Sequence, residues 1–272
     1  MLSGVLMQVV DAFPEKRFNL ARRTKYVSLF KGHPAIARIG YPPRDAEIKS
    51  VNYWAMDQLG GGTHRAYQVL AGSFGLEVPV EEKLYMHDLD HEDPLAEEFI
   101  PWKKVNIAIA PASDSPRKIM PAEHWHHLVD RLNFDGYFVF QMGRARDLHI
   151  RNAYSLLGLT TPRQAIRLLH KADIVITSDN FIMHAAKLAE RPAVVLWGAT
   201  LKEIYGYEDH FHITAPRACD IPVNEECIDS LKNRYGSVYG TDCPLGKDHC
   251  MALIDIQEIY ALTKKIISAT AC

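Results

Sequence analysis

Short apolar runs alternate with longer amphipathic segments through the second half of the chain. Four runs are apolar on both faces and bounded by turn residues, as is typical of buried parallel strands. They cover residues 105–110, 137–142, 174–177 and 193–197. The segments between them have helical spacing, as at Trp125, Leu128 and Leu132, and are long enough to connect one parallel strand to the next. This alternation predicts a doubly wound α/β sheet.

The first half carries a weaker form of the same pattern. It predicts a helix, two strands and a second helix over residues 4–13, 18–21, 36–39 and 63–74. Residues 81–101 are acidic and contain proline without clear periodicity, which is typical of a linker. We therefore predict two domains with a boundary near Pro101, an N-terminal one over residues 1–101 and a C-terminal one over residues 102–272.

Composition and charge narrow the class of protein. Hydrophobic residues make up 47% and charged residues 24%, the balance of a globular protein with a core. A formal net charge of -2 gives no field that would draw the whole molecule to nucleic acid or to an acidic membrane. No apolar run approaches the length of a bilayer span, and the start lacks the pattern of a secretory signal. We expect a cytoplasmic protein with no nucleic-acid partner and at most peripheral contact with a membrane.

The loops at the carboxyl ends of the predicted strands are the candidate sites, because ligands of open parallel sheets bind there. The loop after residues 105–110 contains Ser113 and ends in the adjacent cations Arg117 and Lys118, just before a predicted helix. Such a loop suits a phosphate group. The alternative for Lys118 is a solvated surface charge.

The loop after residues 174–177 precedes a further predicted helix. Ser178, Asp179 or Asn180 can cap this helix, whose N–H groups and partial positive charge form a natural diphosphate site. Because like charges repel, Asp179 is expected to cap the helix or bind a ligand hydroxyl rather than touch phosphate. His184 follows about one helical turn later. The alternatives are an ordinary helix cap and a structural histidine.

These loops belong to a longer motif. It reads Ser-Asp-Asn-Phe-Ile-Met-His-Ala-Ala over residues 178–186 and Arg-Pro-Ala-Val-Val-Leu-Trp-Gly-Ala-Thr over residues 191–200. Together with residues 157–162, 172–173, Lys118 and residues 121–125, it resembles glycosyltransferase family 9, which includes the ADP-heptose:lipopolysaccharide heptosyltransferases. The resemblance covers residues 104–262 well and the first hundred loosely. It implies the GT-B fold of two Rossmann-like domains. The second domain binds the nucleotide sugar, and the first domain binds the acceptor.

The resemblance also implies roles for individual residues. Lys118 would neutralise the leaving diphosphate, Asp179 would bind the donor sugar and cap the helix, and His184 would support the phosphate end. Asp147 matches an acidic residue that the family often has near the nucleotide ribose. The rest of the predicted donor-binding set is Ser113, Arg117, Asn180 and Thr200.

The sequence departs from the family pattern at several positions. Phe181 stands where the family has a glycine, so a conformation with positive φ would be lost there. Ala199 replaces the proline of a Gly-Pro-Thr turn. The family's opening strand and Gly-Asp loop, whose Asp is the presumed general base, have no counterpart, and Asp11 falls inside the predicted first helix. We therefore expect an incomplete N-terminal domain and assign no catalytic residue.

Four of the five cysteines gather near the C-terminus, at Cys219, Cys227, Cys243 and Cys250. Their spacing is looser than that of paired CxxC motifs, so it leaves open a structural zinc or iron site, free thiols, or a disulfide. By the resemblance, iron has a precedent, because certain autotransporter heptosyltransferases use such a cluster for it.

We expect an inverting glycosyltransferase that needs no cofactor for transfer. Its donor would be a nucleotide-diphosphate sugar, a heptose such as that of ADP-heptose by the resemblance, and its acceptor a hydroxyl of a glycan, glycolipid or protein. The alternative is a non-catalytic nucleotide-sugar-binding protein derived from such an enzyme. A Rossmann-type oxidoreductase is disfavoured because no GxGxxG motif follows a strand.

Overall fold

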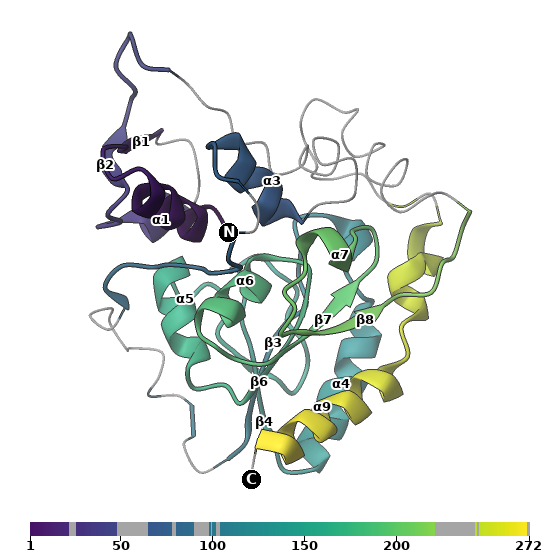
Figure 1. Ribbon diagram of the computed structural model, residues 1–272. Coiled ribbons are helices and arrows are strands. Elements are labelled where there is room, and N and C mark those ends of the chain that lie inside the picture. The colour runs from purple at the N-terminus through teal and green to yellow at the C-terminus, as the bar shows by residue number, and fades with distance from the viewer. Residues whose placement is uncertain are drawn as a thin grey trace. The chain divides into compact units, whose positions relative to one another are not determined.

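The computed structural model describes residues 1–21, 26–47, 65–77, 80–89, 98, 100–101, 104–220, 243 and 245–270. The chain divides into two compact units. The first comprises Met1–Glu92 and Glu203–Tyr205, and the second comprises Asp93–Lys202 and Gly206–Cys272. The α-helices and all strands but β5 are labelled in Figure 1.

In its described part, the first unit combines two parallel strands with two α-helices. Strand β1 (Phe18–Ala21) pairs with β2 (Ile36–Gly40), and helix α1 (Leu2–Ala12) contacts α3 (Ala66–Ser73). A short 3-10 helix, η1 (Val27–Phe30), lies between the strands in sequence. The elements predicted for this half are therefore confirmed, although residues 63 and 64 of the second predicted helix lie outside the described residues.

The second unit contains a parallel sheet, with the strand order β5-β4-β3-β6-β7-β8 among the described residues. Its strands are β3 (Asn106–Ala110), β4 (Phe138–Gln141), β5 (Tyr154–Ser155), β6 (Ile174–Ser178), β7 (Ala193–Trp197) and β8 (Phe211–Thr214). The predicted α/β class and the four predicted strands are confirmed. The two edge strands, β5 and β8, were missed.

Helices cover both faces of this sheet. They are α4 (Ala122–Phe134), α5 (Pro162–Leu169), α6 (Phe181–Leu188) and α9 (Ile256–Thr270). The unit also contains the 3-10 helices η5 (Pro116–Lys118), η6 (Gly246–Asp248) and η7 (Cys250–Leu253), while Glu203–Tyr205 of helix α7 (Lys202–Tyr205) belong to the first unit. Helices α4 and α9 lie side by side on one face, teal and yellow in Figure 1, and α5 contacts α6 on the other. None of the described helices is long and apolar enough to cross a membrane.

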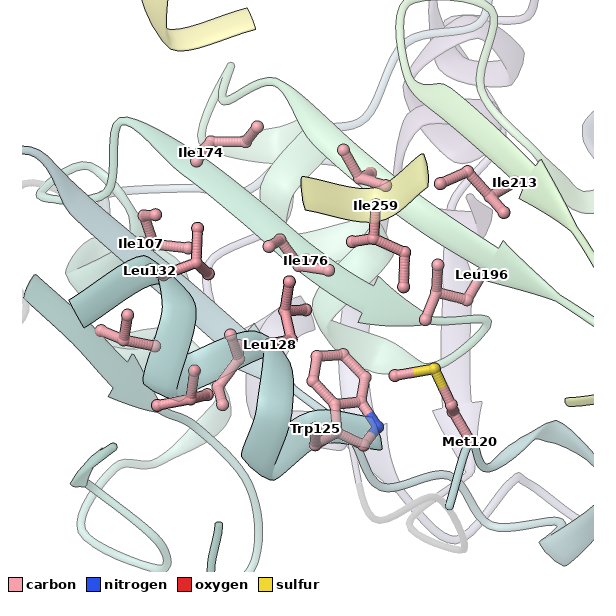
Figure 2. Close-up of a cluster of buried hydrophobic side chains, with 14 of the residues drawn as sticks. Ile107, Met120, Trp125, Leu128, Leu132, Ile174, Ile176, Leu196, Ile213 and Ile259 are labelled. Carbon is pink, nitrogen blue, oxygen red and sulfur yellow. The ribbon is translucent and has the colours of Figure 1, made fainter. Parts of the chain in front are cut away.

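The core of the second unit lies between the sheet and the α4–α9 face. The fully buried side chains of α4, Trp125 and Leu128 among them, follow helical spacing and meet alternate residues of the strands. In Figure 2 they point toward Ile107 and Ile176, with Ile259 of α9 beside them. This packing fixes the sheet from which the loops of the site project.

The strand order creates a switch point at β3. From β3 the chain moves to β4 and β5 on one side, and it then returns to β6 on the other. The loops that follow β3 and β6 therefore start at neighbouring strand ends and leave in opposite directions. In open parallel sheets this arrangement opens the crevice in which ligands bind.

Candidate functional site

A buried ion pair joins the loops that follow β3 and β6. The Nζ atom of Lys118, in η5, lies 3.1 Å from Oδ2 of Asp179, and each side chain is only 8% exposed. The hydroxyl of Thr200, which follows β7, donates to the same oxygen at 2.7 Å. Three strand-end loops thus converge on one carboxylate. The solvated surface position considered for Lys118 is excluded by its burial.

Asp179 is ionised at neutral pH. Burial by itself would raise the pKa of its carboxyl group. The positive charge of Lys118 and the hydrogen bond from Thr200 outweigh burial and hold that pKa below its usual value. Lys118 can bind an anionic ligand at this pair, and the carboxylate of Asp179 can accept a hydrogen bond from a sugar hydroxyl.

Asn180 starts helix α6 and ties the two loops together. Its Oδ1 atom accepts a hydrogen bond from the backbone N–H of Ile182 at 2.7 Å. Its Nδ2 atom donates to the backbone carbonyls of Ala110 and Ala112 at 3.1 and 2.7 Å. One amide side chain therefore caps the helix and also fixes the end of β3 relative to β6.

Of the three residues that the sequence offers as the cap of α6, Ser178, Asp179 and Asn180, it is Asn180 that caps the helix. The cap by Asp179 that the resemblance implied is wrong, because its carboxylate is bonded to Lys118 and Thr200 instead. Phe181 begins α6 without a positive φ. A side chain in place of the family's glycine is therefore compatible with a regular helix start.

Asn180→Asp tests the double role of this residue. Aspartate keeps the cap acceptor, but it loses both N–H donors and brings a negative charge toward the carbonyls of Ala110 and Ala112. We expect the free energy of unfolding to fall by about 2–3 kcal/mol, measured by chemical denaturation at neutral pH. Asn180→Ser is the matched variant, since it also keeps a cap acceptor without adding charge, and it should cost less. No loss in either variant would contradict the role of the amide donors, and equal losses would contradict the cost of the added charge.

Ser113 and Arg117 lie in the same loop as the buried lysine. The Ser113 hydroxyl donates to the backbone carbonyl of Asp179 at 3.2 Å, and Arg117 is buried within η5. The loop after β7 lies against this turn: a Cβ atom added to Gly198 would lie 2.5 Å from Sδ of Met251 and 3.2 Å from the carbonyl oxygen of Arg117. The glycine thus permits the close approach of β7's loop to η5 and η7.

Asp147 lies in the loop after β4 and closes its own turn. Its carboxylate accepts hydrogen bonds from the backbone N–H of Arg144 at 2.7 Å and from Nε of Arg144 at 3.0 Å. Arg144 also pairs with Asp114, which links this loop to the one after β3. The placement of Asp147 near a ribose stays a prediction.

His184 lies on α6, about one turn after the helix starts, and its Nδ1 atom is 2.7 Å from the hydroxyl of Tyr207. Burial lowers the pKa of His184, while the charges of Asp179 and Lys118 act on it in opposite directions. His184 is therefore neutral at physiological pH. It can donate or accept a hydrogen bond at this site, but it carries no charge there.

Residues around Tyr207 were not predicted from the sequence. Tyr207 and His210 precede β8, His212 lies in it, and Trp197 ends β7. Two histidines separated by one residue were a visible signal. They had no place in the predicted sheet, because β8 itself was not predicted.

The cysteine segment is only partly described. Cys219, Cys243 and Cys250 are free and partly exposed, and Cys227 lies outside the described residues. The backbone N–H of Ala218 donates to Sγ of Cys250 at 3.3 Å. Within the described ranges, no three metal-ligating side chains gather in a group that could hold a metal ion. The metal site stays a prediction that involves residues beyond these ranges.

The sequence is similar to those of known glycosyltransferases. The sequence model of glycosyltransferase family 9 (heptosyltransferase) matches residues 25–227. Lipooligosaccharide heptosyltransferase 2 of Haemophilus influenzae is 31% identical over 108 residues, which is 35% of this chain and 31% of that protein. Lipopolysaccharide heptosyltransferase 2 of Salmonella typhimurium is 29% identical over 106 residues, 34% of this chain and 30% of that protein. The matched region spans about a third of the length of these relatives.

Solved structures share the fold. The ADP-heptose lps heptosyltransferase II of E. coli has a TM-score of 0.67 at 14% identity, with 100% of this chain and 95% of that chain covered. The iron-containing dodecameric glycosyltransferase TibC from enterotoxigenic E. coli has a TM-score of 0.72 at 16% identity, with 99% of this chain and 73% of that chain covered. At these identities the likeness concerns the fold, and the predicted GT-B class is confirmed.

Proposed function

The chain belongs to glycosyltransferase family 9, and on this premise we propose that it transfers a sugar from a nucleotide-diphosphate donor to an acceptor hydroxyl. The observation that supports this most directly is the buried Lys118–Asp179 pair at the carboxyl ends of β3 and β6. The matched relatives are named heptosyltransferases, so the proposed sugar is a heptose. The E. coli enzyme that shares the fold is named an ADP-heptose lps heptosyltransferase, so the proposed donor is ADP-heptose.

Two features support a diphosphate at this point. Lys118 supplies a cation, and α6 directs the positive end of its dipole toward the same strand ends. When the bond between the sugar and the diphosphate breaks, negative charge grows on the departing phosphate oxygen. Lys118 and the start of α6 would stabilise that charge in the transition state.

Asp179 has a separate role in this proposal. Its carboxylate lies 3.1 Å from Nζ of Lys118 and neutralises the buried ammonium group. With donor bound, its carboxylate accepts a hydrogen bond from a hydroxyl of the sugar, while Lys118 turns to the diphosphate. The buried pair would thus exchange one set of partners for another and leave no unpaired charge.

The proposed transfer inverts the configuration of the sugar. The acceptor oxygen attacks the anomeric carbon opposite the diphosphate, and the new C–O bond forms as the bond to the phosphate oxygen breaks. The acceptor loses its proton to a base that we assign to no residue. TibC is described as iron-containing, but the described cysteines of this chain do not come together as ligands, so no step of the proposal runs through iron.

The proposed acceptor is a hydroxyl of a glycan, glycolipid or protein, which by the resemblance we assign to the first unit. The cytoplasmic location stays a prediction.

Nucleotide binding and sugar transfer test this function separately. We expect ADP to bind the chain with a Kd between about 1 µM and 1 mM, measured by calorimetry against UDP and GDP. Incubation with ADP-heptose and a glycolipid acceptor should then release ADP and yield a heptosylated product. Binding of ADP without any turnover would instead support the non-catalytic binding protein. A chain that binds none of the three nucleoside diphosphates would contradict both functions.

A further inference from the structure

A chain of hydrogen bonds runs from Trp197 to His184 within the second unit. Nε1 of Trp197 donates to Nδ1 of His212 at 2.9 Å. Nε2 of His212 is 2.9 Å from the backbone carbonyl oxygen of Tyr207. The hydroxyl of Tyr207 is 2.7 Å from Nδ1 of His184. The chain connects β7 and β8 to α6 through the segment that contains Tyr207.

The first two bonds define the protonation of His212. An indole N–H can only donate and a backbone carbonyl can only accept. Nδ1 of His212 must therefore lack a hydrogen, and Nε2 must carry one. The ring is neutral and in a single tautomer, and it fixes the backbone of Tyr207 relative to β7.

The ring of Tyr207 is held as firmly as its backbone. Its side chain is buried, and the ring of His210 packs edge-to-face against it at 5.3 Å. Nζ of Lys187 lies 5.6 Å from the centre of the tyrosine ring and 2.7 Å from a carboxylate oxygen of Asp209. The hydroxyl is thus presented to His184 from a fixed position.

The last bond has two possible directions, because either the phenol or an Nδ1–H of His184 can donate. A phenol is a strong donor and a bare imidazole nitrogen a good acceptor. His184 is neutral, because burial lowers its pKa, and so one of its ring nitrogens is bare. When the Tyr207 hydroxyl donates to Nδ1, the single ring hydrogen of His184 lies on Nε2.

We propose that Tyr207 is a positioning residue for His184: it fixes the neutral ring with its hydrogen on Nε2, as a hydrogen-bond donor to a phosphate oxygen of the nucleotide sugar. The opposite tautomer would turn a lone pair toward that anion and repel it. The identity of the ligand rests on the proposed function, whereas the tautomer of His184 does not depend on it.

The tautomer is measured directly by long-range proton–nitrogen correlation spectra of the ¹⁵N-histidine-labelled chain, with the His184 signals assigned by their loss in His184→Gln. We expect the Nε2–H pattern for His184 in the wild type and averaging between the two tautomers in Tyr207→Phe. Tyr260→Phe is the matched control. Tyr260 lies on helix α9, and its hydroxyl donates to Asp135 at 2.6 Å and not to His184. It should leave the pattern unchanged. An Nδ1–H pattern in the wild type, or no change in Tyr207→Phe, overturns the proposal.

Binding of ADP tests the second half of the proposal. Tyr207→Phe should weaken the affinity by about fivefold to tenfold. In the background of His184→Gln, whose amide supplies an N–H without needing Tyr207, the same change should alter the affinity by less than about twofold. Equal losses in both backgrounds would mean that Tyr207 does not act through His184. If the wild type binds no ADP, the proposed function fails while the spectra still decide the tautomer.

Discussion

Lys118→Met is expected to weaken ADP binding by at least about a hundredfold and to lower the free energy of unfolding by about 3–5 kcal/mol. The first effect follows from the loss of the cation at the proposed diphosphate site. The second follows because Asp179 would remain as a buried carboxylate without its ion-pair partner. Calorimetry with ADP and chemical denaturation at neutral pH measure the two effects independently.

A double variant separates binding from stability. In Lys118→Met/Asp179→Asn both members of the pair are uncharged, and the amide can still accept the hydrogen bond from Thr200. We expect the free energy of unfolding to recover to within about 2 kcal/mol of the wild type, while ADP affinity stays low. Recovery of binding together with stability would remove Lys118 from the ligand site.

An exposed pair serves as the control for this experiment. Lys264 lies 3.0 Å from Asp135, and its side chain is 44% exposed. Lys264→Met should leave the midpoint of denaturation nearly unchanged and should not alter the ADP affinity. The contrast between the two lysines is expected because water screens the exposed pair and not the buried one.

The second large effect is a loss of stability as the pH falls from about 7 to about 5. His210 is buried, and neither ring nitrogen has a hydrogen-bond partner among the described residues. Burial lowers the pKa of His210 from its ordinary value of 6.5 to about 4, with the charge of Asp209 opposing the shift and that of Lys187 adding to it. In this window the unfolded chain binds a proton that the folded chain does not. The contribution of neutral His210 to the free energy of unfolding is complete above the pKa that this residue has in the unfolded chain. It is lost as the pH falls toward the pKa of His210 in the folded chain.

This single group should contribute about 2 kcal/mol to the loss between those two pH values. His210→Phe keeps a ring against Tyr207 but cannot be protonated at this position. Between the same two pH values, its free energy of unfolding should therefore fall by about 2 kcal/mol less than that of the wild type. Denaturation followed by the fluorescence of the buried Trp125 and Trp197 measures it. The matched control is a phenylalanine in place of the exposed His127, which should leave the pH dependence unchanged. An identical pH dependence in wild type and His210→Phe would contradict this assignment.

In the second unit, the strands that the sequence predicts are those buried on both faces. Strands β3 and β7 are buried at every residue, and a continuous apolar run identifies such strands without further context. Strand β8 has only four residues, of which Ile213 alone is buried, and β5 has only two. Short edge strands of this kind leave little pattern to detect. Helix α9 was missed although Ile259, Thr263 and Ile267 carry helical spacing.

The sequence predicts the sheet edge at which the candidate site lies, but not the contacts between its side chains. The rule that parallel sheets bind ligands at strand ends brings Lys118 and Asp179 to one edge. Their direct contact depends on β3 and β6 being neighbours in the sheet, which the spacing of residues along the chain does not encode. The contact of Tyr207 with His184 depends in addition on β8 lying beside β7.

The most direct test of the central claim is a crystal structure of the chain with ADP. We expect the diphosphate at the carboxyl ends of β3 and β6, with a phosphate oxygen in hydrogen-bond distance of Nζ of Lys118 and another at the first turn of α6. ADP bound elsewhere, with the Lys118–Asp179 pair unchanged, would contradict the account.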